Sequence, residues 1–230
     1  MSKKKWLISL AFVLVLSFVL VGCDNESDAI KFKNEYEALN GELSESNSEF
    51  QTLNIPEENP IKYATANEIA DVIENGSGII YFGFPQCPWC RTAVPALLDA
   101  ADEANAKEIL YLNMTEERDI RTIDENGDVV VEREGSEGYQ RIQKLLNDYL
   151  RPYKLTTEDG KEIDTGEKRV YVPFVVVIED GKVVGEHFYT LPIQDEDPWM
   201  SLNEKQHQEL VNIYLEIFKK SSTCDLEVKC

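Results

Sequence analysis

The sequence predicts an α/β protein with a central mixed sheet flanked by helices. Between residues 78 and 114, apolar runs and an amphipathic stretch follow one another as strand, helix and strand. Two further apolar runs, 170–178 and 183–188, flank a turn sequence and predict an antiparallel hairpin. With 230 residues, 43% of them hydrophobic, the chain can bury one sizeable core. We therefore expect one folded domain with appendages.

The first 23 residues indicate the compartment. Three lysines precede an apolar run over residues 6–21, which is shorter than the roughly 20 residues that a membrane-spanning helix needs. The run ends at Cys23 in the sequence Leu-Val-Gly-Cys, which resembles the lipobox of bacterial lipoproteins. The resemblance implies a signal peptide over residues 1–22 and a lipid on the sulfur of Cys23. The alternative is an uncleaved signal anchor with the same membrane attachment.

Residues 23–60 are expected to carry the acyl group and to act as a flexible tether. This stretch is rich in Glu, Asn and Ser and has two prolines near its end. Phe32, Tyr36 and Leu39 fall at helical spacing and indicate a short amphipathic helix. We expect the folded domain to span residues 61–220, followed by a cysteine-containing tail over residues 221–230.

The domain is predicted to begin with a helix over residues 65–74, ended by an Asn-Gly pair. Residues 78–84 form an apolar run that fits a strand buried on both faces. A helix starting at Pro88 follows, because proline suits the first helical position. Residues 109–114 read as the next strand, parallel to the first through a right-handed crossover.

The second half alternates between polar and periodic stretches. Residues 115–169 are mostly polar, with Asn-Gly and Asp-Gly turn signals at 126–127 and 159–160. A helix is predicted within them over residues 139–150. The last amphipathic helix is predicted over residues 202–218.

Cys87 and Cys90 are the candidate reactive residues. They lie where a strand passes into a helix, so we expect the sulfur of Cys87 to be exposed at the helix N-terminus. The unpaired N–H groups and the positive end of the helix dipole favour the thiolate there. Cys90, one turn further on, is expected to lie beneath Cys87 and to resolve a mixed disulfide intramolecularly.

These motifs resemble those of the thioredoxin superfamily. The strand, the Cys87-Pro88-Trp89-Cys90 run and Pro95 five residues later match the family's active-site helix, and residues 172–183 match its cis-proline strand and hairpin. The resemblance spans residues 61–220. The combination of a lipoprotein signal, a Cys-Pro-aromatic-Cys run and a long insert is most similar to thioredoxin-like lipoproteins of Gram-positive bacteria, including the bacteriocin transport accessory group.

The resemblance implies the remaining site residues. Pro173 should follow a cis peptide bond and Val172 should offer its backbone to a bound peptide, while Pro88 and Trp89 adjust redox potential and access. Two features depart from the family. Tyr81 replaces the buried acid six residues before the first cysteine, and 82 residues separate Cys90 from Pro173. The second departure implies an insert over about residues 115–169.

The implied activity is extracytoplasmic thiol-disulfide exchange on protein thiols and disulfides, with no organic cofactor and no metal. It requires an electron partner in the membrane or outside it, and the sequence leaves the direction of exchange open. The formal net charge of −20, without a concentrated basic stretch, argues against nucleic acid as a partner. An acidic surface of this size keeps a protein soluble and monomeric. The lipobox resemblance, not the charge, implies a location at the outer face of the cytoplasmic membrane.

Several alternatives remain open at this level. Cys87 and Cys90 could supply half of a zinc site, although the two histidines have no ligand spacing, or could form a purely structural disulfide. The fold could instead serve a non-catalytic accessory protein that binds a secreted peptide or a membrane exporter. Cys224 and Cys230 are expected to form a small structural disulfide, or else a second dithiol that exchanges with Cys87.

Overall fold

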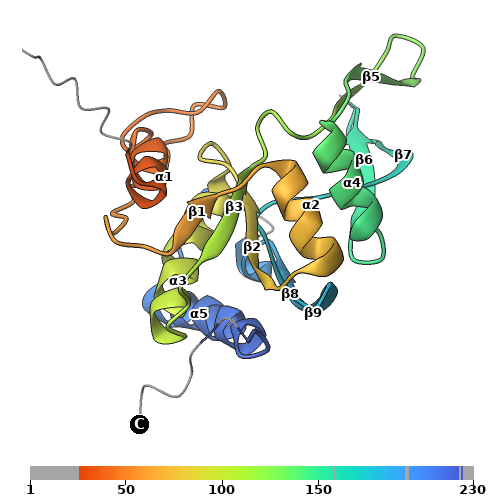
Figure 1. Cartoon of the computed structure of the whole chain (residues 1–230). Helices are drawn as coiled ribbons and strands as arrows, with labels where there is room; N and C mark the ends of the chain where they lie inside the picture. Colours follow the sequence, from red (N-terminus) through yellow and green to blue (C-terminus); the bar gives the residue numbers. More distant parts are fainter. Residues whose placement is uncertain (1–25, 158, 195–196, 223, 225–230) are drawn as a thin grey trace, which may run out of the picture.

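The computed structural model describes residues 26–157, 159–194, 197–222 and 224 (Figure 1). The predicted signal peptide, Cys23 and Cys230 lie outside the described residues. Within them, no helix combines the length and the apolar character needed to span a bilayer.

A five-stranded mixed sheet forms the centre, in the order β1-β3-β2-β8-β9. The first three of these strands are parallel, whereas β8 runs antiparallel to β2 and β9 antiparallel to β8. The bounds are β1 Ile61–Tyr63, β2 Gly78–Gly83, β3 Ile109–Asn113, β8 Phe174–Glu179 and β9 Lys182–Phe188. The predicted mixed sheet is confirmed.

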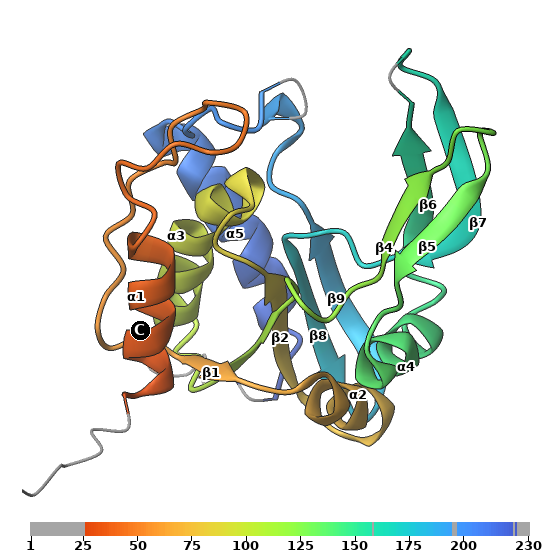
Figure 2. The same cartoon turned by 90° about the horizontal axis from the view of Figure 1, so that it is seen from above.

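Helices cover both faces of this sheet (Figure 2). α2 (Ala66–Asn75) packs with α4 (Glu137–Leu145) on one side, and α3 (Pro88–Glu103) with α5 (Glu204–Phe218) on the other. Local sequence fixes their starts: Thr65 and Glu68 form a capping box at α2, as Asn203 and Gln206 do at α5. A short 3-10 helix, Pro192–Gln194, precedes α5.

The central strands are apolar on both faces because helices cover each side. All four residues from Ile79 to Phe82 of β2 are fully buried, as are the first five residues of β8. Ile80 and Tyr81 pair with Val176 and Val175 across the two strands. This continuous burial matches the apolar run that predicted the strand.

The predicted insert is not one continuous addition. It contains two hairpins, β4 (Ile120–Ile123) with β5 (Val129–Arg133) and β6 (Arg151–Thr156) with β7 (Glu162–Arg169), which lie side by side beyond the sheet (Figures 1 and 2). The helix between them, α4, belongs to the layer of α2. A Cβ at Gly138 would lie 2.6 Å from the Ala66 Cβ, so the two helices approach at this glycine.

The prediction of a tether reaching to residue 60 is wrong for the described part of that segment. Helix α1 (Asp28–Glu37) packs beside β1, and Phe32 and Tyr36 are fully buried. Leu53 and Ile55 join the same core. Polar composition hid this, because a few apolar side chains at the right spacing suffice to cover the β1 end of the sheet.

If α1 is part of the core, Phe32→Ala should destabilise the protein by about 3–5 kcal/mol, the usual cost of removing a buried aromatic ring. Ile30→Ala is the matched control on the same helix, since Ile30 is 36% exposed, and should cost less than about 0.5 kcal/mol. Urea denaturation of the full chain in neutral detergent measures both. Equally small losses would mean that α1 does not pack on the sheet.

Candidate functional site

Cys87 is the N-cap residue of α3. Its sulfur accepts a hydrogen bond from the Cys90 N–H at 3.2 Å, and Pro88 occupies the first helical turn, where no N–H is needed. The spacing of the two cysteines is therefore the spacing of a cap residue and the third residue of its helix. This places both residues on one helical turn, with an N–H donor aimed at the first sulfur.

Cys90 lies below, completely buried. Burial raises the pKa of the Cys90 thiol well above its ordinary value, and the hydrogen bond and charge of Cys87 raise it further. A hydrogen bond from Tyr81 acts in the opposite direction. The predicted position of Cys90 is confirmed, and its thiol is held in the protonated form.

The Val172-Pro173 peptide bond is cis, as predicted, and it faces the cysteines. The Cys87 thiol donates to the Val172 carbonyl oxygen at 3.8 Å. The Tyr189 N–H donates to the Pro173 carbonyl at 2.7 Å, and Tyr189 has a positive φ of 62°, which is uncommon for an aromatic residue. Two segments that are far apart in sequence thus meet at the sulfur of Cys87.

A cavity of about 560 Å³ opens over this sulfur. Its walls are largely aromatic and include Phe84, Trp89, Tyr171 and Tyr189. The Trp89 indole N–H donates to the Gln194 carbonyl at 3.3 Å, which fixes the ring beside the cavity. Cys87 itself is only 4% exposed, so the expectation of an exposed sulfur is wrong. Access to it runs through the cavity.

Two buried tyrosines lie under the cysteines. One of them is Tyr81, which the sequence analysis identified in place of a buried acid. The Tyr81 hydroxyl lies 3.1 Å from that of Tyr36, and a Cβ at Gly83 would collide with the Tyr81 hydroxyl. Burial raises the pKa of both phenols well above 10. Sequence reasoning found Tyr81 but missed Tyr36, although the helical spacing of Phe32 and Tyr36 was a signal.

Arg91, the residue after Cys90, was also missed. Its fully buried guanidinium group donates to the carbonyl oxygens of Tyr36 at 2.8 Å and of Gln51 at 2.6 Å, and to Asn40 Oδ1 at 2.9 Å. These acceptors all lie in the N-terminal segment. Arg91 therefore ties that segment to the helix that carries the cysteines.

Cys224 lies far from this site. It forms an isolated bridge with Ala106, just past the C-terminal end of α3. The 16 residues of α3, at about 1.5 Å rise each, put it roughly 24 Å from Cys87. The alternative in which this thiol exchanges directly with Cys87 does not fit this separation. The predicted disulfide with Cys230 lies outside the described residues.

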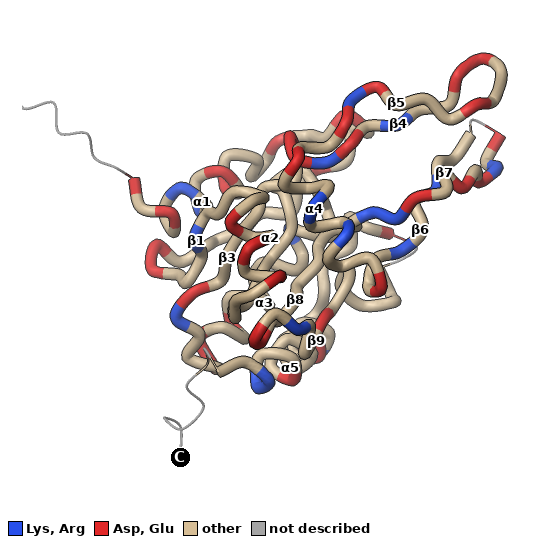
Figure 3. The backbone as a smooth tube through the Cα atoms, turned by 45° about the vertical axis from the view of Figure 1, so that its right-hand side comes forward, with Lys and Arg blue, Asp and Glu red and all other residues tan. Residues whose placement is uncertain are grey.

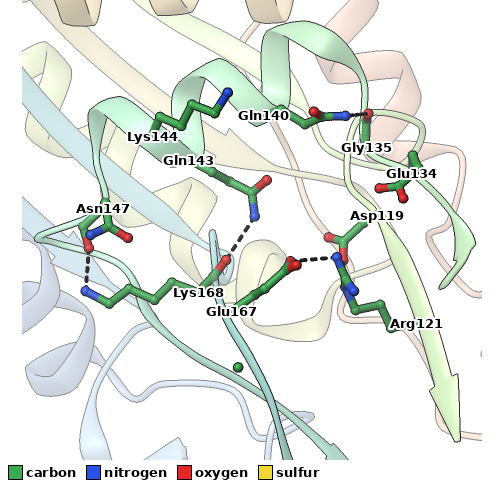
Figure 4. A pocket seen from close by; sticks show the side chains of 11 residues that line it. Asp119, Arg121, Glu134, Gly135, Gln140, Gln143, Lys144, Asn147, Glu167 and Lys168 are labelled. Atoms are coloured by element: carbon green, nitrogen blue, oxygen red, sulfur yellow. Dashed lines mark hydrogen bonds and ion pairs between the residues drawn. The ribbon is translucent and has the colours of Figure 1, made fainter. Parts of the chain in front are cut away.

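A second cleft, of about 640 Å³, lies between the hairpins and α4 (Figure 4). Its charged groups largely satisfy one another: Arg121 pairs with Asp119 and Glu167, and the Lys168 ammonium donates to the Asn147 carbonyl. No cysteine or histidine lines it. The cysteine cavity is therefore the stronger candidate for a reactive site.

A scan of the chain against models of known protein families finds no match, and a search of curated proteins finds none either.

The burial of Cys90 predicts a loss of stability in alkali. Because its pKa is raised on folding, the stabilising contribution is complete below the ordinary thiol pKa of about 8.5 and is lost as the pH rises above it. In wild type kept reduced, the free energy of unfolding should fall from about pH 8.5, and more steeply above about pH 10, where the buried tyrosines add the same sign.

Cys90→Ala should remove the part of this fall between about pH 8.5 and 10. Urea denaturation at fixed pH values measures it, and Cys224, whose pKa burial also raises, is present in both proteins and cancels in the difference. Identical pH profiles for the two proteins would contradict a buried, protonated Cys90.

Proposed function

We propose that this protein is a thiol-disulfide oxidoreductase of the thioredoxin fold that acts on protein thiols and disulfides through Cys87 and Cys90. The observation that carries the proposal is the meeting of three features at one sulfur. Cys87 caps α3, Cys90 lies buried one turn below it, and the cis Val172-Pro173 bond stands opposite.

The arrangement of the sheet supports the fold assignment. Three parallel strands, β1, β3 and β2, continue into the antiparallel pair β8 and β9, and two helices cover each face. The reactive cysteines follow the carboxyl end of central strand β2, and the cis-proline precedes its neighbour β8. These are the positions that the resemblance to the thioredoxin superfamily implies.

In the reductive direction, the Cys87 thiolate attacks one sulfur of a substrate disulfide. A Cys87–substrate disulfide forms, and the other substrate sulfur leaves as a thiolate that takes a proton from water. Cys90 then loses its proton to water and attacks the Cys87 sulfur as a thiolate. The Cys87–Cys90 disulfide forms, and the second substrate sulfur leaves as a thiolate that takes up a proton. Two electrons pass from protein to substrate, and the reverse sequence oxidises a substrate dithiol.

The surroundings suit these two roles. Cys87 has an N–H donor at 3.2 Å and a cavity above it, which suits a nucleophile that must meet a large substrate. Cys90 has no exposed surface and a raised pKa, so it stays protonated until a mixed disulfide forms beside it. This difference between the two sulfurs supports an order in which Cys87 reacts first and Cys90 second.

We further propose that the protein works outside the cytoplasmic membrane, held there by a lipid on Cys23. The support is the lipobox-like sequence before Cys23 and the even number of cysteines beyond it, which suits a compartment where disulfides persist. A dithiol donor or a disulfide acceptor at the membrane must return the pair to its starting state after each turnover. The reduction potential of the Cys87–Cys90 pair relative to that of the donor or acceptor determines whether the protein reduces or oxidises its substrate.

Cys87→Ser should reduce insulin reduction and refolding of a scrambled substrate to the uncatalysed rate, because the hydroxyl is not a competent nucleophile. Cys90→Ser should keep the first step and accumulate a covalent adduct with substrate, visible by mass spectrometry without reductant. Cys224→Ser, remote from the cavity, should leave the activity unchanged. Equal behaviour of wild type and Cys87→Ser in both assays would favour the non-catalytic accessory protein instead.

A further inference from the structure

One cation lines the cavity over Cys87. Arg118 belongs to the segment between β3 and β4, and its guanidinium carbon lies 4.7 Å from the centre of the Phe84 ring, with which it shares the cavity wall. Stacking on a ring leaves the N–H groups at the edge of a guanidinium group free to donate. In the described part of the chain, no carboxylate forms an ion pair with Arg118 and no acceptor receives a hydrogen bond from its guanidinium group.

The cavity is unusual for this chain because it contains no acid. The protein has 43 Asp and Glu residues against 23 Lys and Arg, yet none of the residues lining the cavity is acidic. Arg118 is half-buried, and burial together with the nearby charge of Arg169 lowers its pKa. Holding a cation here without a counter-ion costs free energy, which an anionic ligand would recover.

Two further arginines lie near the aromatic side chains around the cavity. The guanidinium group of Arg151 lies 5.8 Å from the centre of the Tyr189 ring, and that of Arg169 lies 4.1 Å from the centre of the Tyr153 ring. The surrounding segment is not basic as a whole: residues 115–169 hold 15 acids and 10 bases, and both kinds appear along the hairpins in Figure 3. The positive charge is therefore confined to the surroundings of the cavity, where its sign is opposite to that of the net charge of the chain.

We propose that Arg118 selects substrates that carry an acidic side chain next to the reacting cysteine. This inference rests on the proposed oxidoreductase function and names its substrate class: peptides with Asp or Glu beside the cysteine. The aromatic walls take the apolar parts of the peptide, the Val172 carbonyl takes a backbone N–H, and Arg118 takes the carboxylate. Arg118 touches substrate and not the sulfur that leaves, so it is a specificity residue.

Three peptides of one sequence test the inference, with Asp, Asn or Lys on both sides of a single cysteine activated as its neutral 2-pyridyl disulfide. Cys87 attacks the peptide sulfur, a Cys87–peptide disulfide forms, and 2-thiopyridone leaves with the electron pair and is followed by absorbance. The reduced full chain in neutral detergent is used under single-turnover conditions. Wild type should react with the Asp peptide about tenfold faster than with the Asn peptide, which corresponds to about 1.4 kcal/mol.

Arg118→Gln should abolish this preference, and Arg118→Lys should keep part of it. Arg141→Gln is the matched control. It removes the same charge from an arginine of α4 that pairs with Asp71 and Glu74 of α2, and it should keep the full preference. The mixed disulfide of glutathione with 2-thiopyridine, which has the same leaving group as the peptides, serves as a carboxylate-bearing disulfide that is not a protein substrate.

The possible results distinguish a failure of acidic substrate selection from a failure of the proposed oxidoreductase function. Arg118→Gln that slows all three peptides equally, or that keeps the Asp preference, would overturn acidic selection. If this glutathione disulfide reacts as fast as the Asp peptide, the cavity would be assigned to small disulfides, which would overturn acidic peptide selection too. If wild type reacts with none of these disulfides, the proposed oxidoreductase function would be contradicted, and this inference would fail with it.

Discussion

The buried guanidinium group of Arg91 joins the N-terminal segment, residues 28–55, to helix α3 and the central sheet. A charge without access to water is tolerated only when its N–H groups are satisfied, and here the acceptors are carbonyl oxygens of Tyr36 and Gln51 and the side chain of Asn40. If residues 28–55 detached from α3, Arg91 would lose most of these acceptors. The N-terminal segment is therefore a fixed part of the domain, and the clamp that fixes it lies one residue after Cys90 on the same helix.

That attachment also builds the floor of the cysteine site. α1 brings Tyr36 to Tyr81 of β2, where the two hydroxyl groups meet. The rings of Phe32 and Tyr111 pack around this pair at centroid distances of 4.6–6.5 Å. A floor of neutral phenols surrounds Cys90 with low-dielectric material and provides no negative charge. The thiol of Cys90 is then kept protonated by burial and by Cys87, and a carboxylate is not needed to separate the behaviour of the two sulfurs.

Local sequence predicted the features that depend on neighbouring residues. The alternation of apolar runs gave the strands and helices of the central layer, and the position of Cys87 before Pro88 gave the capped helix. The features that it missed depend on contacts across the chain. Tyr36 meets Tyr81 from 45 residues away, Arg91 bonds Gln51 from 40, and Gly138, in the middle of what looked like one insert, lets α4 pack against α2. Polar composition over residues 24–60 disguised a segment in which Phe32, Tyr36, Leu53 and Ile55 are buried in the core.

The cysteine site and most of the arginines lie in different parts of the molecule, the first in the central layer and the second in the segments that carry the two hairpins. The reactive sulfurs, the helix cap and the cis peptide bond all belong to β2, α3 and the start of β8, where buried, rigid elements hold them in place. Arginines are instead concentrated in the added segments, which are partly exposed and can bear charge without a desolvation cost in the core. Arg118 is the one among them that reaches the cavity, by stacking on Phe84 beside the cysteine helix. The proposed reactivity and the proposed charge selection can therefore vary independently, because a change in the hairpins alters the charge around Cys87 without disturbing the helix cap and the cis peptide bond that surround its sulfur.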